Sequence, residues 1–430
     1  MITTRTFCKL STLTFLTACG VGDYAAMASA ADAVQADSLS DMFSDGKVSG
    51  YVRSLYFSSH NAFYERGKNQ DTVSYGGELA FHSAVYEGFS FGLSALVQRG
   101  IGHDDNPNKV DSYLGPNVTS VGEAYLQWQR DKFRITVGDQ RFDAPFTGTS
   151  DYRMVPQMFQ GVSAYYGDSA NFLTAFRMYR FKSVLDDSYS RHTSYNPPID
   201  SSAAGAGDEK TDGFWGVGGG KTWALKPVSF DGQAWYFKYL DYADMTYLQA
   251  RAIRADGLVK PFVAVQYMHQ DDDGKAILGK VDSNVYGVQL GIKVNSVTAS
   301  LGYDYIKPNS DSYLNGAPVI PYGHKLSSGD FFAQPLLTST MDLGAGNAYA
   351  INVKGAPLQN LVLGARYSFM DLKNAPTAQS LDQSEYLVYG SYSFGGALKG
   401  VKLSDFLGVQ KSPIKDATFL QNRVALEYVF

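Results

Sequence analysis

The chain is short of cysteine, proline and charge, and each shortage excludes a class of protein. Its two cysteines, Cys8 and Cys19, both lie near the N-terminus, so a body stapled by disulfides is excluded. Proline contributes 15 of 430 residues and charged residues make up 18%, below the roughly 25% of soluble domains. After the leader no apolar run approaches about 20 residues, which excludes helical membrane spans. The net charge of -5 gives no reason to expect nucleic acid as a partner.

The first 30 residues have the features of an export signal. Arg5 and Lys9 precede the apolar stretch "LSTLTFLTACGVG", and small residues follow as far as Ala30. Cleavage after Ala30 fits the A-x-A pattern, whereas "LTAC", which ends at Cys19, matches a lipoprotein signal. We expect residues 1–30 to be a cleaved signal peptide and 31–46 a flexible periplasmic segment. The folded body would then be residues 47–430.

The body is rich in aromatic residues and glycine, and its apolar residues alternate with polar ones. The chain contains 30 Tyr, 26 Phe and 43 Gly. Segments such as "FSFGLSALVQ", "FRITVGDQ" and "NVYGVQLGIKV" place apolar residues on one face of a strand and polar residues on the other. This alternation alone would also suit a soluble sandwich.

The connections between these strands discriminate better. Short turns such as "RDK", "LKP", "ADG" and "GAP" alternate with long polar loops near 58–72, 99–119, 139–160, 181–212, 269–283, 306–346 and 370–384. Such a pattern predicts an all-β fold, a transmembrane antiparallel β-barrel of about 18 strands, with 16 as the alternative. An even number puts both termini in the periplasm.

Aromatic residues cluster near the ends of the predicted strands, as in "WYFKYLDY" and "YLVYGSYSF". Such rings suit the two interfaces of a bilayer. The chain ends in "NRVALEYVF", and its alternating aromatic residues up to Phe430 resemble the signal that hands bacterial outer-membrane barrels to their assembly machinery. We therefore expect the bacterial outer membrane as the location, with lipid and lipopolysaccharide as neighbours.

If one parity of each strand faces lipid, the other faces the lumen and carries the chemistry. Charged residues opposite the apolar stripes are assigned to the lumen, and the phase of Arg134, Lys293 and Arg366 follows from their apolar neighbours alone. In strands of ambiguous phase, such as "GYVRSLYF", the charge itself decides, because a charge that faces lipid at mid-depth costs about 2–4 kcal/mol. The predicted lumen acids are Glu78, Glu123, Asp304 and Glu427. The predicted lumen bases are Arg53, Arg134, Arg177, Lys238, Arg251, Lys293, Lys354, Arg366 and Arg423.

This excess of bases has two interpretations. Guanidinium groups bind carboxylates through a planar fork of donors, so a basic wall would attract small anionic or zwitterionic solutes and pass them between weak sites. Alternatively, the bases pair with acids of the wall or with loops and stiffen the barrel.

One long loop, "GDQRFDAPFTGTSDYRMVPQMFQG" at 138–161, is unusually apolar for a solvated segment. Six of its residues need a place to bury: Phe142, Phe146, Met154, Val155, Met158 and Phe159. Folding inward against the barrel wall would bury them and narrow the pore.

At this loop the sequence resembles the OprD family of substrate-specific outer-membrane porins. The resemblance is carried by "VGDQRFDAPF" and by "DYRMVPQMFQG", a D-x-R-x-x-P-x-x-F-x-G pattern. It is supported by "GKVSGYVRSLYF", "PYGHKLSSGDFF" and "GAGNAYAINVKG", and it covers most of residues 46–430.

The resemblance implies an 18-stranded monomeric barrel with inward-folded loops, a narrow constriction and a ladder of basic residues. It also implies small substrates that bear a carboxylate, such as amino acids, small peptides and aromatic acids. Only Arg141, Asp151 and Arg153 transfer by position as channel residues.

Two rival functions stay open: a non-specific general diffusion porin and an outer-membrane enzyme. A hydrolytic barrel needs a nucleophile, a histidine and an orienting partner in one place. The histidines mostly lie in predicted loops, although His82 lies near Glu78, and the sequence contains no G-x-S-x-G elbow. "GVGGGKT" and "QDDDGK" miss the spacing of a phosphate loop and a calcium loop. We expect no enzymatic activity, no cofactor and no metal.

Overall fold

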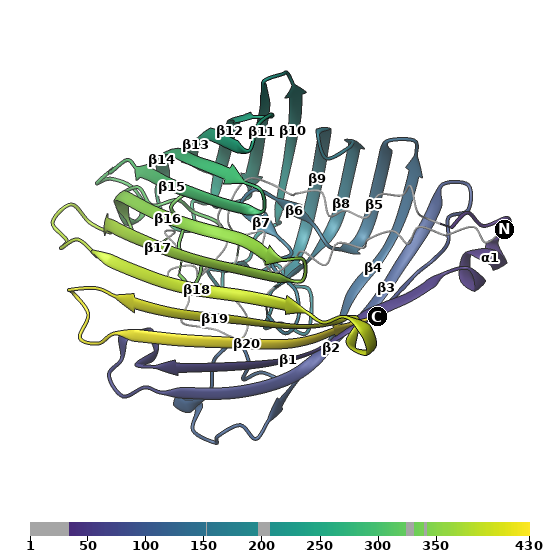
Figure 1. Cartoon of the computed structure of the whole chain (residues 1–430), viewed down its shortest axis with the longest axis horizontal. Helices are drawn as coiled ribbons and strands as arrows, with labels where there is room; N and C mark the ends of the chain where they lie inside the picture. Colours follow the sequence, from purple (N-terminus) through teal and green to yellow (C-terminus); the bar gives the residue numbers. More distant parts are fainter. Residues whose placement is uncertain (1–33, 152, 197–206, 324–330, 339–341) are drawn as a thin grey trace.

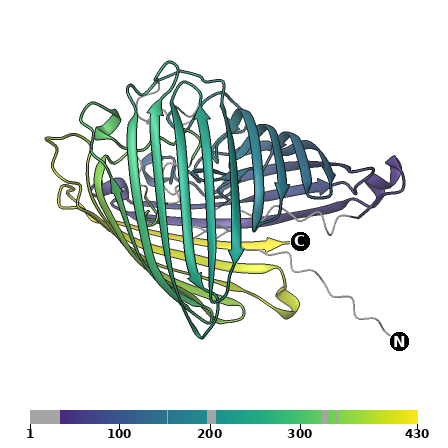
Figure 2. The same cartoon turned by 90° about the horizontal axis from the view of Figure 1, so that it is seen from above.

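A closed antiparallel barrel of 18 strands forms the body of the protein, as predicted. The computed structural model describes residues 34–151, 153–196, 207–323, 331–338 and 342–430, so the predicted signal peptide lies outside the described residues. The sheet closes because β1 (Lys47–His60) pairs with both β2 (Gln70–His82) and β20 (Phe419–Val429). Figure 1 and Figure 2 show the strands side by side in a continuous wall.

Neighbouring strands of the barrel are also neighbours in the chain. The other wall strands are β3 (Phe89–Ile101), β4 (Val118–Arg130), β5 (Phe133–Gln140), β8 (Met158–Gly167), β9 (Asn171–Lys182), β10 (Phe214–Ala224), β11 (Val228–Tyr239), β12 (Ala243–Arg254), β13 (Val259–Asp272), β14 (Asp282–Val294), β15 (Val297–Ile306), β16 (Ala345–Leu358), β17 (Leu361–Lys373), β18 (Gln383–Ser393) and β19 (Val401–Lys411). A separate hairpin consists of β6 (Asp143–Ala144) and β7 (Thr147–Gly148). Single 3-10 turns are η2 (Ala62–Tyr64), η3 (Pro107–Lys109), η4 (Tyr313–Asn315) and η5 (Gly396–Leu398).

The connections are long at one end of the barrel and short at the other. At the long-loop end, β5 and β8 are joined through 141–157, and β15 and β16 through 307–344. At the short-turn end, where β1 begins and β20 ends, two-residue turns join β4 to β5 and β14 to β15. The predicted turn "GAP" is wrong, because β16 continues to Leu358 through a register shift after Gly355.

The segment before β1, predicted to be flexible, has local structure that its composition did not indicate. Helix α1 (Leu39–Ser44) starts at Ser38, whose hydroxyl accepts a hydrogen bond from the Asp41 backbone N–H at 3.2 Å. Gln35 forms a parallel bridge with Val85, in the turn between β2 and β3. Within the described ranges, no helix is long and apolar enough to cross a lipid bilayer.

The outer face carries a belt of aromatic rings. Ring centroids lie 5.2 Å apart for Tyr267 and Tyr286, 5.2 Å for Tyr303 and Tyr349, and 4.9 Å for Tyr367 and Tyr386. Aromatic belts of this kind mark the bilayer interfaces of outer-membrane barrels.

The aromatic cluster "WYFKYLDY" contradicts the simple rule that apolar residues face lipid. Trp235, Phe237 and Tyr239 are buried and share the inward parity of β11, while Tyr236 lies on the outer face. They belong to an apolar core at the long-loop end, inside the barrel, which also contains loop residues 142, 146, 319, 320, 322 and 331. Loops that enter the barrel thus make part of its inner wall apolar.

Residues 331–338 form a loop segment that lies against the inner wall, where three charged side chains of the wall hold it. The Asp304 carboxylate accepts a hydrogen bond from the Ala333 N–H at 2.6 Å. The Arg366 guanidinium donates to the carbonyl oxygens of Phe332 at 2.9 Å and Gln334 at 2.6 Å. Glu385 accepts from the N–H groups of Leu336 and Leu337 at 2.8 and 3.1 Å. Charge-assisted hydrogen bonds are about twice as strong as neutral ones, so these contacts fix the segment firmly.

Substituting Gly302 by valine should release this segment from the wall. A Cβ atom at Gly302 would lie 2.5 Å from the Phe332 carbonyl oxygen, which is too close for either group to stay in place. We expect faster proteolytic cleavage within 307–344, because the displaced segment becomes accessible. Limited proteolysis of the purified barrel measures this.

Gly395→Ala provides the control, because a Cβ atom there meets nothing within 4 Å. It should be cleaved at the wild-type rate. Identical cleavage of Gly302→Val and wild type would show that the segment does not depend on the close approach at Gly302.

Candidate functional site

The apolar residues of segment 138–161 are buried and pack against side chains of the barrel wall. Phe142, Phe146, Met154, Val155, Met158 and Phe159 are all buried. The Phe142 ring lies 4.6 Å from that of Phe176 on β9, and the Phe146 ring lies 5.0 Å from that of Tyr247 on β12. This packing places the charged residues of the loop beside the charged residues of β1, β2, β4 and β20.

Arg53 connects this loop to the seam where the barrel closes. Its Nε donates to Glu427 Oε2 at 2.7 Å, and its Nη1 donates to Asp151 Oδ1 at 2.9 Å. Nη1 also donates to the backbone carbonyl of Arg153. Lys402 of β19 adds an ion pair with Glu427 at 3.1 Å. The Arg53 side chain is 3% exposed, so it holds the loop against the seam.

Arg141 lies among three carboxylates but retains hydrogen-bonding capacity. Its Nη2 donates to Glu78, and its Nε and Nη1 lie 3.9 Å from Glu123 and Asp151. The two longer separations are too great for hydrogen bonds. The Arg141 side chain is 33% exposed, so part of it remains accessible to solvent.

Together these side chains form an ion-pair network of Arg53, Arg141, Lys402, Glu78, Glu123, Asp151 and Glu427. It contains three bases and four acids. His82 pairs with Glu123 at 3.0 Å and adds a positive charge only when protonated. The lumen at this level is therefore a balanced set of charges, and not the mainly basic wall that the sequence predicted.

The network shifts the ionisation of its loop residues. Burial alone would raise the pKa of the Asp151 carboxyl, but the Arg53 and Arg141 guanidiniums outweigh burial and hold this pKa below its ordinary value. For Arg141, burial alone would lower the pKa, and the carboxylates of Glu78, Asp151 and Glu123 raise it instead. Both groups are thus ionised at neutral pH.

Arg153 does not face a water-filled channel, contrary to the sequence prediction. It is 1% exposed, and its guanidinium carbon lies 4.2 Å from the ring centroid of Tyr113 and 5.2 Å from that of Phe57. These are cation–π contacts, which are strongest away from water. Arg153 therefore joins the loop to β1 and to the loop between β3 and β4.

Seven of the predicted lumen bases lie on the inward parity of their strands: Arg53, Arg134, Arg251, Lys293, Lys354, Arg366 and Arg423. Besides the Arg53–Glu427 pair described above, Arg251 and Arg134 also contact neighbouring wall strands. Arg251 forms an ion pair with Asp231 at 2.7 Å, and Arg134 lies 5.4 Å from the ring centroid of Tyr165.

The predicted inward position is wrong for Arg177 and Lys238. Arg177 has the parity of Leu173 and Tyr179, which are exposed on the outer face, and it donates to the Asp212 carbonyl at 2.8 Å. Lys238 has the parity of Tyr236 and pairs with Asp244 at 3.2 Å. In both strands the inward-facing residues are apolar because inserted loops pack against them. In these strands an apolar residue therefore need not face lipid.

Sequence reasoning missed two charged residues that have structural roles in the lumen. Lys402 lies on β19, where the exposed Leu403 and Leu407 indicate the opposite parity and could have placed it inward. Glu385 binds the backbone of an inserted loop, a contact that no local pattern indicates.

Comparison with known proteins agrees with this architecture. A sequence model described as outer membrane porin, OprD family, matches residues 40–429. A search of curated proteins found no match.

Several solved structures have the same fold. OpdK of Pseudomonas aeruginosa, determined with vanillate, has a TM-score of 0.74 at 17% identity, over 90% of this chain and 99% of OpdK. A BenF-like porin of Pseudomonas fluorescens Pf-5 has a TM-score of 0.75 at 14% identity, and the match covers 90% of this chain and 99% of the BenF-like porin. OccK2 (OpdF) of Pseudomonas aeruginosa, determined in complex with glucuronate, has a TM-score of 0.72 at 15% identity. The match covers 90% of this chain and 97% of OccK2.

The family match covers nearly the whole described barrel, and the 18-strand closure is shared with these structures. Family and fold indicate the bacterial outer membrane. The chain belongs to the OprD family of outer-membrane porins.

Proposed function

We propose that this porin is a passive channel for small solutes that bear a carboxylate, and that Arg141 contacts the solute. The observation that carries the proposal is the geometry of Arg141: it is one third exposed, it hydrogen-bonds Glu78, and it lies 3.9 Å from both Glu123 and Asp151. At 3.9 Å the Nε and Nη1 groups of Arg141 form no hydrogen bond with Glu123 or Asp151, so a solute carboxylate could accept hydrogen bonds from them.

Balanced charge around Arg141 suits a channel better than a tight binding site. Conduction requires binding that is favourable enough for entry and weak enough for release. The neighbouring carboxylates reduce the net attraction for an anion, while the buried pairs at Arg53 keep the loop in position. Vanillate and glucuronate, found with two structures of the same fold, both carry a carboxylate, which supports this substrate class.

We propose a different role for each of the predicted residues around this network. Arg141 would contact the solute, Asp151 would tune the charge beside it, and Arg53 and Arg153 would position the loop. The inner-face bases Arg134, Arg251, Lys293, Lys354 and Arg423 would supply weaker sites along the wall. Arg366 is engaged by an inserted segment and would have a positioning role.

Arg141→Gln and Asp151→Asn should shift ion selectivity in opposite directions. The first removes a positive charge from the solute path and the second a negative charge from between two guanidiniums. A unit charge at about 4 Å in water is worth about 1 kcal/mol, about a fivefold change in local ion concentration. Reversal potentials in a KCl gradient across a planar bilayer should move toward K⁺ for Arg141→Gln and toward Cl⁻ for Asp151→Asn.

Arg254→Gln is the control, because Arg254 lies on the outer face and pairs with Asp256 at the short-turn end. Its reversal potential should match wild type. Liposome swelling then tests the substrate class: Arg141→Gln should slow the entry of gluconate and leave the entry of glucose unchanged. Equal entry of gluconate and glucose into wild-type liposomes would instead favour a general diffusion porin.

The contribution of Asp151 should persist into mildly acidic solution. Its pKa is lowered in the folded protein, so its pairing with Arg53 stabilises the folded state fully above the ordinary aspartate pKa and is lost as the pH falls through the lowered value. Wild type and Asp151→Asn should therefore differ in reversal potential from pH 7 down to about pH 4 and converge below it. A difference that already vanished near pH 6 would contradict this assignment.

A further inference from the structure

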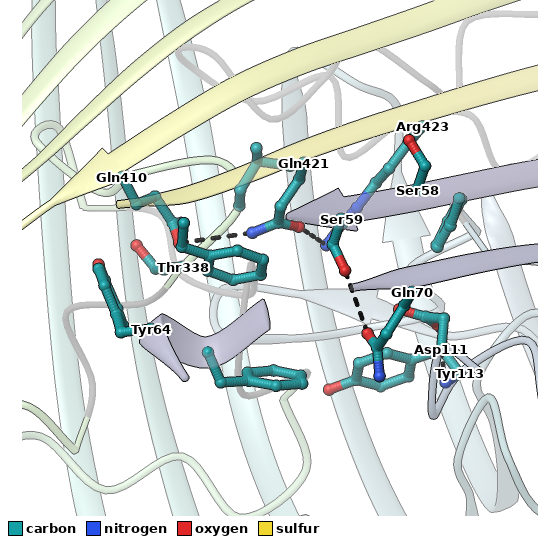
Figure 3. A pocket seen from close by; sticks show the side chains of 14 residues that line it. Ser58, Ser59, Tyr64, Gln70, Asp111, Tyr113, Thr338, Gln410, Gln421 and Arg423 are labelled. Atoms are coloured by element: carbon teal, nitrogen blue, oxygen red, sulfur yellow. Dashed lines mark hydrogen bonds between the residues drawn. The ribbon is translucent and has the colours of Figure 1, made fainter. Parts of the chain in front are cut away.

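Two arginines of β9, Arg177 and Arg180, lie on the outer face of the barrel, outside the lumen. Other bases at the long-loop end face inward. Arg423, for example, lines a pocket on the inner side of β19 and β20 together with Gln410 and Gln421 (Figure 3). The long loops of outer-membrane barrels face the outside of the cell, so Arg177 and Arg180 lie at the level of the outer leaflet.

A β-bulge turns both arginines to the same face of the wall. Gln160 of β8 pairs with Arg180, and the residue after Gln160 pairs with Met178, so Tyr179 is the extra residue of β9. In a regular strand, residues three positions apart lie on opposite faces. The extra residue changes this alternation, and Arg177 and Arg180 therefore share one face.

The neighbours of Arg180 show that this shared face is the outer one. Its partner Gln160 donates to Asp139 Oδ1 at 2.7 Å, and Asp139 has the same parity as Val137, which is exposed on the outer face. Phe181, the residue after Arg180, belongs to the apolar core inside the barrel. Arg180 consequently points toward the membrane side of the wall.

The guanidinium of Arg177 is held in place and keeps donors for a ligand. Its Nη1 donates to the carbonyl oxygens of Met178 at 2.8 Å and Phe214 at 3.2 Å, and its Nη2 donates to that of Asp212 at 2.8 Å. The guanidinium carbon lies 4.6 Å from the ring centroid of Tyr179. A guanidinium has five N–H donors, so the Nε–H and one N–H of Nη2 remain.

Neither arginine forms an ion pair with a carboxylate among the residues that the structure describes. Asp212, whose carbonyl oxygen contacts Arg177, pairs through its carboxylate with Arg191. Asp139 attracts Arg180 from two strands away, but its carboxylate accepts a hydrogen bond from an amide of β8 instead. The two guanidiniums therefore present a positive surface to the outer leaflet.

Further along the same rim the outer face becomes acidic. Lys238, which lies opposite Trp215, already pairs with Asp244 at 3.2 Å. Beyond Lys238, Asp244, Asp271 and Asp282 lie opposite one another on β12, β13 and β14. Like charges at such positions repel an anion. An anionic headgroup would thus be excluded there and attracted to β9.

Toward the middle of the wall, the face below the arginines is apolar. Leu173 of β9 and Val217 of β10 are exposed on this face. Trp215 and Tyr179 are also exposed, at the level of the arginines, where aromatic rings suit the bilayer interface. The surface therefore fits an amphiphile with an anionic headgroup and acyl chains.

We propose that Arg177 and Arg180 bind a phosphate group of lipid A, the lipid anchor of lipopolysaccharide. Guanidiniums bind phosphate bidentately through charge-assisted hydrogen bonds. A phosphate monoester, as in lipid A, carries a charge of about -1.5 to -2, which matches two arginines better than the single charge of a phosphodiester. The acyl chains would lie along Leu173 and Val217. This site is separate from the channel and does not depend on the solute that the channel carries.

Native mass spectrometry of the purified full-length barrel, titrated with lipid A of defined structure, tests the proposal. Bisphosphorylated lipid A should bind at least fivefold more tightly than dephosphorylated lipid A. A basic residue beside anionic lipid contributes about a fivefold change in affinity, so Arg177→Gln and Arg180→Gln should each weaken binding about fivefold. Arg177→Lys should weaken it less, because the positive charge is kept.

Arg254→Gln is the matched control, because Arg254 is also an outer-face arginine but lies at the short-turn end and pairs with Asp256. Its affinity for lipid A should equal that of wild type. Wild-type affinity in both Arg177→Gln and Arg180→Gln would overturn the site. Equal binding of bisphosphorylated and dephosphorylated lipid A would overturn it as well.

Two competitors distinguish the possible sources of the phosphate. Phosphatidylglycerol carries a phosphodiester, and inorganic phosphate has no acyl chains, so each should displace bisphosphorylated lipid A only at tenfold or greater excess. Displacement by an equal concentration of phosphatidylglycerol would assign the site to a glycerophospholipid. Displacement by an equal concentration of inorganic phosphate would assign it to a free anion. Either result would overturn lipid A as the occupant.

Discussion

The absence of water in the bilayer core is the constraint on which the whole structure depends. Every backbone N–H and C=O of the wall must find a partner within the protein, and only a closed ladder provides one for each strand. The pairing of β1 with β20 completes that ladder. Closure fixes one face of each strand outward and the other inward. It also brings Arg53 and Glu427, far apart in the chain, to the same register position.

A closed barrel leaves an interior that has to be filled or hydrated, and this protein does both. In the sector from β9 to β14, loop residues pack against inward aromatic side chains and form an apolar core. Elsewhere, charged wall residues bind loop backbone, as Asp304, Arg366 and Glu385 do for 331–338. The inner charges therefore fall into two groups: some hold loops in place, and others remain partly exposed. Arg141, at 33% exposure, belongs to the second group, and Arg153, at 1%, belongs to the first.

The ion-pair network shows why a count of charges predicts a pore poorly. Nine bases and four acids were expected to give a basic lumen, but at the level of Arg141 the acids equal or exceed the bases. A carboxylate orients the guanidinium of both Arg53 and Arg141, and Arg141 keeps donors that form no hydrogen bond with Glu123 or Asp151. Selectivity would then follow from the direction of these donors and from the shape around them more than from net charge.

The sequence by itself determined the barrel and the unusual loop at 138–161, and it predicted about 18 strands with 16 as the alternative. The alternation of apolar and polar residues and the spacing of turns are local properties of the sequence, so they can be recognised without knowing which strands or loops contact one another. It also placed seven of nine wall bases inward, because most strands have a true lipid face. It failed at Arg177 and Lys238, where inserted loops make the inner face as apolar as the outer one.

Only the tertiary structure decided which residues meet inside the barrel and at its rim, such as Arg53 with Asp151 or Phe63 with Phe419. These contacts join segments dozens to hundreds of residues apart, and no local periodicity encodes the fold of a loop against a distant strand.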